Sequence, residues 1–395
     1  MLSLGSLSTV ALLLHAYTTS CHAQSFNLAK DYSGSSFFDE WDFYGHWDNL
    51  TLGDINWVTR ENATAKQLAY VNDAGRAVLR VDTNPVVWNE KRDTVRITSQ
   101  REYDLGTIWV ADIAHMPFGC SVWPALWTKG HTWPDDGEID IIEGINLNQN
   151  NQIALHTHWD PPCTHVDPPP ANQRGTSGNL NCSSAAGCTV LETAPNSIGA
   201  GFNSAGGGVY ATQYDVTGIY IWFWSRPNIP QSILSTTSTS GLSSLADWGP
   251  PTAAYPAGTH CDIARSFSPQ SIVVTITLCG QWAGNPEFYT PQCGGQGPTG
   301  ICYDDNVVGD GSNYNEAYFE INYIRAYSDP NATPNTVTRT STSTGTTTTR
   351  PSTTATTTAG GSTGGGTGAA TTNLASLSLI WMGTALIGGL LAAVL

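Results

Sequence analysis

Short segments in which apolar and polar side chains alternate are the feature that most limits how this chain can fold. The clearest is Thr107–His115, and others lie at Arg76–Val81, Val95–Thr98, Ile272–Leu278 and Tyr318–Tyr327. A period of two residues predicts strands that bury one face. Clusters of Gly, Pro and Asn separate these segments, and amphipathic helical periodicity is hard to find between them. The pattern therefore predicts an all-β fold, a sandwich of two antiparallel sheets of the jelly-roll type.

The middle of the chain has the composition of one folded domain. Residues 24–330 contain no internal repeat and no linker rich in Gly and Pro. This length exceeds that of a simple sandwich, so long loops are expected at 160–205 and 228–260. We expect disulfides to hold these loops against the sheets.

The first 23 residues have the pattern of a signal peptide. An apolar run from Val10 to Ala16 is followed by small and polar residues, and Ala23 ends a small-x-Ala cleavage motif. No Lys or Arg precedes the run, and a buried first strand is the alternative. The pattern predicts that the chain is secreted and that, after cleavage, it begins near Gln24.

The C-terminal segments lack the composition of a packed domain. Residues 331–373 are more than half Ser and Thr, which predicts an extended, O-glycosylated stalk. Residues 374–395 are apolar to the end, and a transmembrane helix is one interpretation. No Lys or Arg follows Arg350 to flank such a helix. Small residues, a polar spacer and an apolar tail favour a GPI-attachment signal instead, and hence the outer face of the plasma membrane or the cell wall.

Cysteines and sequons agree with an oxidising compartment. Of nine cysteines, Cys21 leaves with the signal, and the eight that remain are an even number suited to disulfides. Cys293 and Cys302 bracket a Gly-rich loop and are the one pair that the spacing suggests. A zinc site is the alternative, but no CxxC pair occurs. Four Asn-x-Ser/Thr sequons predict N-glycosylation, at Asn49, Asn62, Asn181 and Asn331.

The charge and the tryptophan content narrow the class of partner. The chain has 32 acidic against 16 basic residues, a formal net charge of −16. This field repels phosphate backbones and anionic headgroups, so nucleic acid is not expected as a partner. A neutral polymer is not repelled. Thirteen of the fourteen tryptophans precede the apolar tail, a high number for a chain in which only 12% of the residues are charged. Some belong to the core, and flat sugar faces give the others a reason to lie at the surface.

Three acids in one short segment are the strongest candidate for chemistry. In Glu138-Ile-Asp140-Ile-Ile-Glu143 the charged residues alternate with Ile, as in a strand with one acidic and one apolar face. Glu143 is five residues from Glu138 and points the wrong way in a regular strand. A β-bulge at Ile141-Ile142 restores it to the acidic face. The segment therefore predicts three carboxylates on one face of one strand.

Such a cluster suits glycoside hydrolysis. Like charges raise one another's pKa, and a glycosidase needs one ionised carboxylate beside one that keeps its proton. A solvated edge strand and a calcium site are the alternatives. A solvated edge does not need Ile on its other face, and the order of acids does not match an EF-hand loop.

The same residues resemble the active-site strand of glycoside hydrolase family 16. The resemblance extends to Gly119–Trp127, to Gly280–Gly284 and to Ala317–Tyr327, and covers about Gln24–Tyr327. Fungal laminarinase-like endo-1,3(4)-β-glucanases are the most similar members. The resemblance implies a jelly-roll with an open concave cleft and a retaining mechanism. Glu138 would be the nucleophile, Glu143 the acid/base, and Asp140 would bond to Glu138.

Aromatic residues near the acids are the expected sugar platforms. Trp123 and Trp127 are four residues apart and share a face of an extended strand, and Trp282 matches a cleft tryptophan of the family. Core packing is the alternative for each, and it is left open for Trp133. By similarity His156 contacts a sugar hydroxyl, although a His-x-His metal pair with His158 is conceivable.

The leading prediction is a monomeric hydrolase of β-1,3 or mixed β-1,3/1,4-glucan that needs no metal or organic cofactor. A cell-wall transglycosylase with the same acids is the closest alternative. Family transglycosylases usually have a shorter E-x-D-x-E strand, so the second Ile favours the glucanase. A non-catalytic glucan-binding sandwich is the third interpretation.

Overall fold

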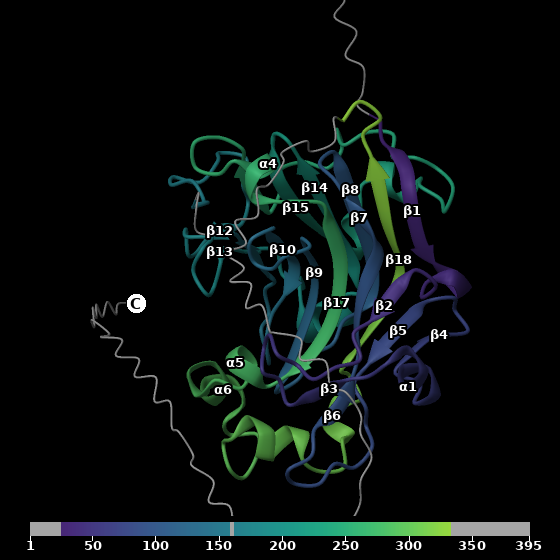
Figure 1. The fold of residues 1–395 in the computed structure, drawn as a ribbon, viewed down its shortest axis with the longest axis vertical. Coiled ribbons are helices and arrows are strands. Elements are labelled where there is room, and N and C mark those ends of the chain that lie inside the picture. The colour runs from purple at the N-terminus through teal and green to yellow at the C-terminus, as the bar shows by residue number, and fades with distance from the viewer. Residues whose placement is uncertain (1–24, 159–161, 333–395) are drawn as a thin grey trace, which may run out of the picture. The chain divides into compact units, whose positions relative to one another are not determined.

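Two antiparallel sheets form the molecule in the computed structural model, which describes residues 25–158 and 162–332 (Figure 1). The predicted signal peptide, GPI-attachment tail and nearly all of the stalk lie outside these residues. Within them, no helix is both long and apolar enough to cross a membrane.

The first sheet has eight strands. Their bounds, in spatial order, are β16 (Ala253–Pro256), β15 (Gly218–Ser225), β14 (Gly208–Asp215), β8 (Thr107–His115), β18 (Tyr318–Ser328), β5 (Ala77–Arg80) and β4 (Ala69–Val71), with β1 (Asn27–Ser33) also paired to β18.

The second sheet also has eight strands and contains the acidic segment. Their order is β12 (Thr176–Ser177), β13 (Cys188–Leu191), β11 (Gln152–His156), β10 (Glu138–Glu143), β9 (Val122–Lys129), β17 (Gln270–Leu278), β7 (Arg96–Tyr103) and β2 (Trp41–Phe43). Strand β10 is thus an interior strand, hydrogen-bonded on both sides.

Short elements join the strands. Strands β3 (Ile55–Trp57) and β6 (Arg92–Thr94) form a parallel pair. The helices are α1 (Arg60–Ala65), α2 (Gly199–Ser204), α3 (Gln231–Leu234), α4 (Ile263–Ser266), α5 (Gly280–Ala283) and α6 (Pro286–Cys293), with single turns at Gly34–Ser36, Arg226–Asn228, Tyr303–Val307 and Ser312–Tyr314. The predicted long loops contain several of these elements.

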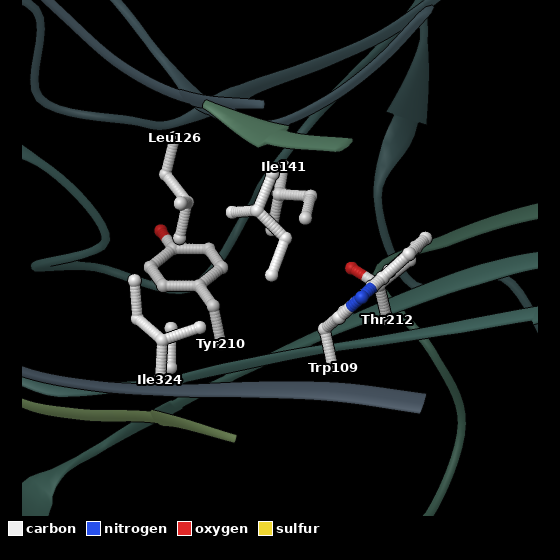
Figure 2. Close-up of a pocket in the computed structure, with 8 residues that line it drawn as sticks. Trp109, Leu126, Ile141, Tyr210, Thr212 and Ile324 are labelled. Atoms are coloured by element: carbon white, nitrogen blue, oxygen red, sulfur yellow. The ribbon is translucent and has the colours of Figure 1, made fainter. Parts of the chain in front are cut away.

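The core lies between the sheets and is built from the alternating faces that the sequence predicts. Figure 2 shows Leu126 and Ile141 of the second sheet pointing toward Trp109, Tyr210 and other side chains of the first. These residues are at most 3% exposed. The apolar face of the acidic segment therefore fixes β10 against the core, as expected of a jelly-roll sandwich.

Four disulfides join all eight cysteines of the described chain, and the pair suggested by spacing is wrong. Cys293 bonds to Cys120 and Cys302 bonds to Cys279. The other two pairs are Cys163–Cys261 and Cys182–Cys188. The Gly-rich loop is thus held at both ends, but each cysteine bonds to a partner outside it. Cys163–Cys261 ties the first predicted long loop to the residue after the second, rather than to a sheet. Cys182–Cys188 does reach a strand, since Cys188 begins β13.

Candidate active site

A β-bulge in β10 brings the three acids to one face. Against β9, Asp140 pairs with Trp127 while Ile142 pairs with Leu126, so Ile141 has no partner of its own. Against β11 the register shifts between Asp140 and Glu143. The predicted bulge is therefore present, and Glu143 faces the same cleft as Glu138 and Asp140.

Asn151 holds the bulge, a role that no sequence pattern predicted. Its side-chain oxygen accepts the backbone N–H of Glu143 at 2.9 Å, and its amide donates to the Ile141 carbonyl at 2.9 Å. Asn151 is fully buried. Two backbone groups that the bulge removes from the sheet ladder are thus satisfied by one side chain.

Each acid has a different neighbour. The indole N–H of Trp133 donates to Oε2 of Glu138, and that of Trp123 donates to Oε1 of Glu143 at 2.9 Å. Asp140 lies deepest, at 2% exposure, with its Oδ2 3.3 Å from Nε2 of His156. Indole donors at both ends of the cluster orient the outer carboxylates toward the cleft.

The turn before β10 fixes the start of the strand at Glu138. Gly137 has a positive φ of 80°, and a Cβ there would lie 2.3 Å from the Phe267 ring. Only glycine combines this backbone conformation with so close a neighbour.

Burial makes the cluster retain protons. It raises the pKa of Glu138 to about 8, with a further increase from the nearby charge of Asp140. It raises the pKa of Glu143 to about 7, against the hydrogen bond from Trp123, which lowers it. Asp140 also has a pKa well above its ordinary value, because of burial and then the charge of Glu143. The three carboxyls therefore hold protons at pH values where isolated carboxyls have lost them.

The acids line an open cleft of about 620 Å³ on the second sheet. This volume is within the roughly 300–1,000 Å³ typical of ligand sites. Its aromatic wall is formed by Trp57, Trp123, Trp127, Trp133, Trp282 and Phe288. A hollow with this lining suits the flat apolar faces of sugar rings.

Trp123, Trp127 and Trp282 all line the cleft, but they present different areas. Trp123 and Trp282 are half-buried and meet edge to face at 5.4 Å between ring centroids. Trp127 is only 5% exposed, and its N–H donates to the Thr275 hydroxyl. It forms part of the floor and packs in a small core cluster with Ala125.

Two disulfide-bound segments contribute to the wall. Cys279–Cys302 closes the segment that contains Trp282, and Cys120–Cys293 ties its helix α6 to the start of β9. The loop closed by Cys182–Cys188 is the other segment, and it places Ala185 and Ala186 in the cleft.

His156 and His158 diverge and do not form a His-x-His pair. His156 lines the cleft beside Asp140, whereas Nδ1 of His158 contacts Asp135 at 2.7 Å. A different group could hold a cation. Glu138, Asp140 and His156 each offer a ligand atom, and these atoms lie within 4.8 Å of one another.

Sequence reasoning missed Arg96 and Asp48 as well as Asn151. Arg96 is 7% exposed, lies over the Trp127 ring at 5.3 Å and lines the cleft. Asp48 accepts the backbone N–H groups of Leu50 and Gly53 and so shapes a rim loop. Both come from strands or loops far from β10 in the sequence, and no local pattern marks them.

The side chains of the four predicted glycosylation sites are exposed. Asn49 lies on the rim loop, Asn62 in α1, Asn181 beside the Cys182–Cys188 loop and Asn331 after β18. Their modification stays a prediction.

Comparison with known proteins agrees with this geometry. A family model described as the XgeA-like catalytic domain of glycoside hydrolase family 16 matches residues 41–327. A probable glycosidase of Schizosaccharomyces pombe is 35% identical over 311 residues, which are 77% of this chain and 70% of that protein. A probable endo-1,3(4)-β-glucanase of Aspergillus fumigatus is 35% identical over 336 residues. That match covers 83% of this chain but only 49% of the relative, so the chain spans about half of its length.

Two solved structures share the fold and a third of the sequence. One is described as an elongating family 16 β-1,3-glucosyltransferase, with 36% identity, a TM-score of 0.69, and coverage of 77% of this chain and all of the other. The second is laminarinase 16A of Phanerochaete chrysosporium with β-glucans in donor and acceptor sites, with 32% identity, a TM-score of 0.70, and coverage of 77% and 99%. The sandwich, the bulged acidic strand and these matches together place the chain in glycoside hydrolase family 16.

Proposed function

We propose that this glycoside hydrolase cleaves β-1,3 or mixed β-1,3/1,4-glucan within the chain, with retention of anomeric configuration. The observation that carries the proposal is the bulge in β10. Because of it, Glu138, Asp140 and Glu143 all face one cleft lined by aromatic side chains. The curated relative from Aspergillus fumigatus and the laminarinase structure support β-glucan as the substrate class.

In the first step, the carboxylate of Glu138 attacks the anomeric carbon and the bond to the leaving oxygen breaks. Glu143 gives its proton to that oxygen, so the shortened chain leaves as an alcohol and a glycosyl ester remains on Glu138. In the second step, Glu143 takes a proton from water, whose oxygen attacks the anomeric carbon and releases Glu138. The raised pKa of Glu143 lets it hold this proton near neutral pH. The pKa of Glu138 is also raised, so Glu138 must lose its own proton before it attacks.

The neighbours of the acids fit these roles. Trp133 donates to Glu138 and stabilises its negative charge before attack. Trp123 holds Glu143 in place through one oxygen. Asp140 lies between them in the strand. Its negative charge raises the pKa of Glu138, and a proton on either carboxyl relieves the repulsion between the two.

Transglycosylation is a second candidate, because one structural match is described as an elongating glucosyltransferase. It uses the same glycosyl ester, which a sugar hydroxyl attacks in place of water. Products formed from laminarin with and without an added oligosaccharide acceptor separate the two. Net shortening supports hydrolysis as the main reaction, and elongated chains contradict it. If laminarin, lichenan and other β-glucans all stay intact, the chain is a binding protein and the proposal is wrong.

We also propose that the protein acts outside the cell, with a GPI anchor at the plasma membrane or wall. Four disulfides in the described chain support an oxidising compartment. Release of the native protein from cells by a phosphatidylinositol-specific phospholipase C tests the anchor. Retention after that treatment and release only by detergent would favour a transmembrane tail.

A further inference from the structure

Three side chains suited to a transition metal converge where β10 pairs with β11. Glu138 and His156 are directly opposite each other in the ladder, and Asp140 is two residues along the same face. Their ligand atoms lie within 4.8 Å of one another. Strand pairing thus sets the spacing of this group, and neither strand has to move to assemble it.

The spacing within the group matches that of zinc ligands. Tetrahedral zinc binds imidazole nitrogen and carboxylate oxygen at about 2.0–2.2 Å, so two such ligands lie roughly 3.4 Å apart. Nε2 of His156 and Oδ2 of Asp140 are 3.3 Å apart. One edge of the coordination tetrahedron is therefore already formed.

Asp140 supplies a second indication of a ligand. Its Oδ2 is buried and makes no hydrogen bond among the described residues, and its contact with Nε2 of His156 at 3.3 Å lacks hydrogen-bond geometry. A buried carboxylate oxygen in this position is unfavourable, and a cation held between it and the imidazole would satisfy it. Imidazole nitrogen and carboxylate oxygen are both zinc ligands, and an open site holds the ion by three protein ligands, so the cleft leaves the fourth position to water.

We propose that Glu138, Asp140 and His156 form an inhibitory site for Zn²⁺. The ion takes electron pairs from both carboxylates and from the imidazole, so Glu138 is no longer free to attack an anomeric carbon. Because the ion lies on the floor of the cleft, it competes with the glucan. Binding of the ion is independent of the proposed function, whereas inhibition rests on it.

Calorimetric titration of the purified protein with Zn²⁺, without substrate, tests the site directly. We expect one saturable ion per chain, with affinity at least tenfold weaker in His156→Gln and in Asp140→Asn. His158→Gln is the matched control, because it removes a histidine that contacts an acid outside the group. It should bind as the unaltered protein does. No saturable binding, equal binding by His156→Gln, or loss of binding in His158→Gln would each overturn the assignment.

Kinetics with laminarin tests the consequence. Zn²⁺ should raise the apparent KM and leave kcat unchanged, and EDTA should reverse the effect. Zinc binding that depends on His156 in a protein without glucanase activity would contradict the proposed function and leave the site standing. An active enzyme that binds no zinc would contradict the site alone.

Discussion

The two faces of strand β10 place opposite demands on one short segment. Its apolar face presents Ile139 and Ile141, which are at most 3% exposed. Figure 2 shows Ile141 pointing toward the side chains of the first sheet. Toward the cleft the strand presents three carboxyls whose pKa values are all raised. The inner face stabilises the fold through burial, whereas the cleft face costs stability whenever its acids ionise. Burial of the inner face thus offsets the cost of the acids on the cleft face.

The largest effect is expected at the cleft face. Glu138→Gln keeps an acceptor for Trp133 but removes the nucleophile, so kcat on laminarin should fall about 10³-fold or more. Glu61→Gln, an exposed acid in α1, is the matched control and should retain full activity. More than a tenth of normal activity in Glu138→Gln would remove its catalytic role.

The inner face should respond through stability. Ile141→Ala deletes buried methyl groups beneath the acids and should lower the free energy of unfolding by about 2–4 kcal/mol. Urea denaturation measures this change. Ile301→Ala, at a side chain that is 55% exposed, should change it by less than about 0.5 kcal/mol. Equal effects would mean that Ile141 does not anchor the strand.

Asn151 joins the two faces, and its removal should affect both. Asn151→Ala leaves the Glu143 N–H and the Ile141 carbonyl without partners, at a cost of about 1–3 kcal/mol in stability. Because Glu143 then loses its fixed position, kcat should fall more than KM rises. A loss of stability with normal kcat would assign Asn151 a structural role only.

Trp282 tests whether the aromatic wall binds sugar. Trp282→Ala should weaken binding of laminari-oligosaccharides by about 1–3 kcal/mol, a magnitude borrowed from aromatic stacking on nucleobases. Trp88→Ala is the control, since Trp88 is 72% exposed and does not line the cleft. An unchanged KM in Trp282→Ala would make this indole a packing residue.

The smallest expected effect is the loss of folding stability that ionisation of Glu143 causes. The folded pKa of Glu143, about 7, lies above its ordinary value of 4.5, so the native state binds more protons between these values and stability falls as pH rises through them. Glu143→Gln removes this loss. The variant should be more stable by about 1–2 kcal/mol at pH 8, after allowance for solvent screening at a half-buried group, and equal to the unaltered protein near pH 4. A variant that is less stable at pH 8 would contradict the cost that we assign to the cleft face.

Periodicity along the sequence predicted the strands and the common face of the three acids, because it is a local property of the chain. The expected strand at Thr107–His115 coincides with β8, and the five-residue spacing of Glu138 and Glu143 predicted the bulge. Strand β7 was predicted only to Thr98 but runs to Tyr103, because Gln100–Glu102 face solvent and break the alternation.

The partners of the acids were harder to predict because they come from distant segments. The disulfide partner of Cys293 depends on α6 folding back against the start of β9, which spacing along the chain does not encode. Asn151 and Arg96 are single polar residues without a pattern. Asn151 acquires its role only through the pairing of β10 with β11, and Arg96 only through the place of β7 in the same sheet. Trp133 was left open because a loop tryptophan gives no periodic signal, yet it donates to Glu138.

The anomer released first in hydrolysis tests the central claim most directly. Proton NMR of laminari-oligosaccharide cleavage, recorded before mutarotation equilibrates the new reducing ends, distinguishes the two stereochemical outcomes. If the bulge brings Glu138 and Glu143 to bear on one bond as nucleophile and acid/base, the β-anomer appears first. The α-anomer appearing first would mean inversion, and it would contradict the double displacement on Glu138.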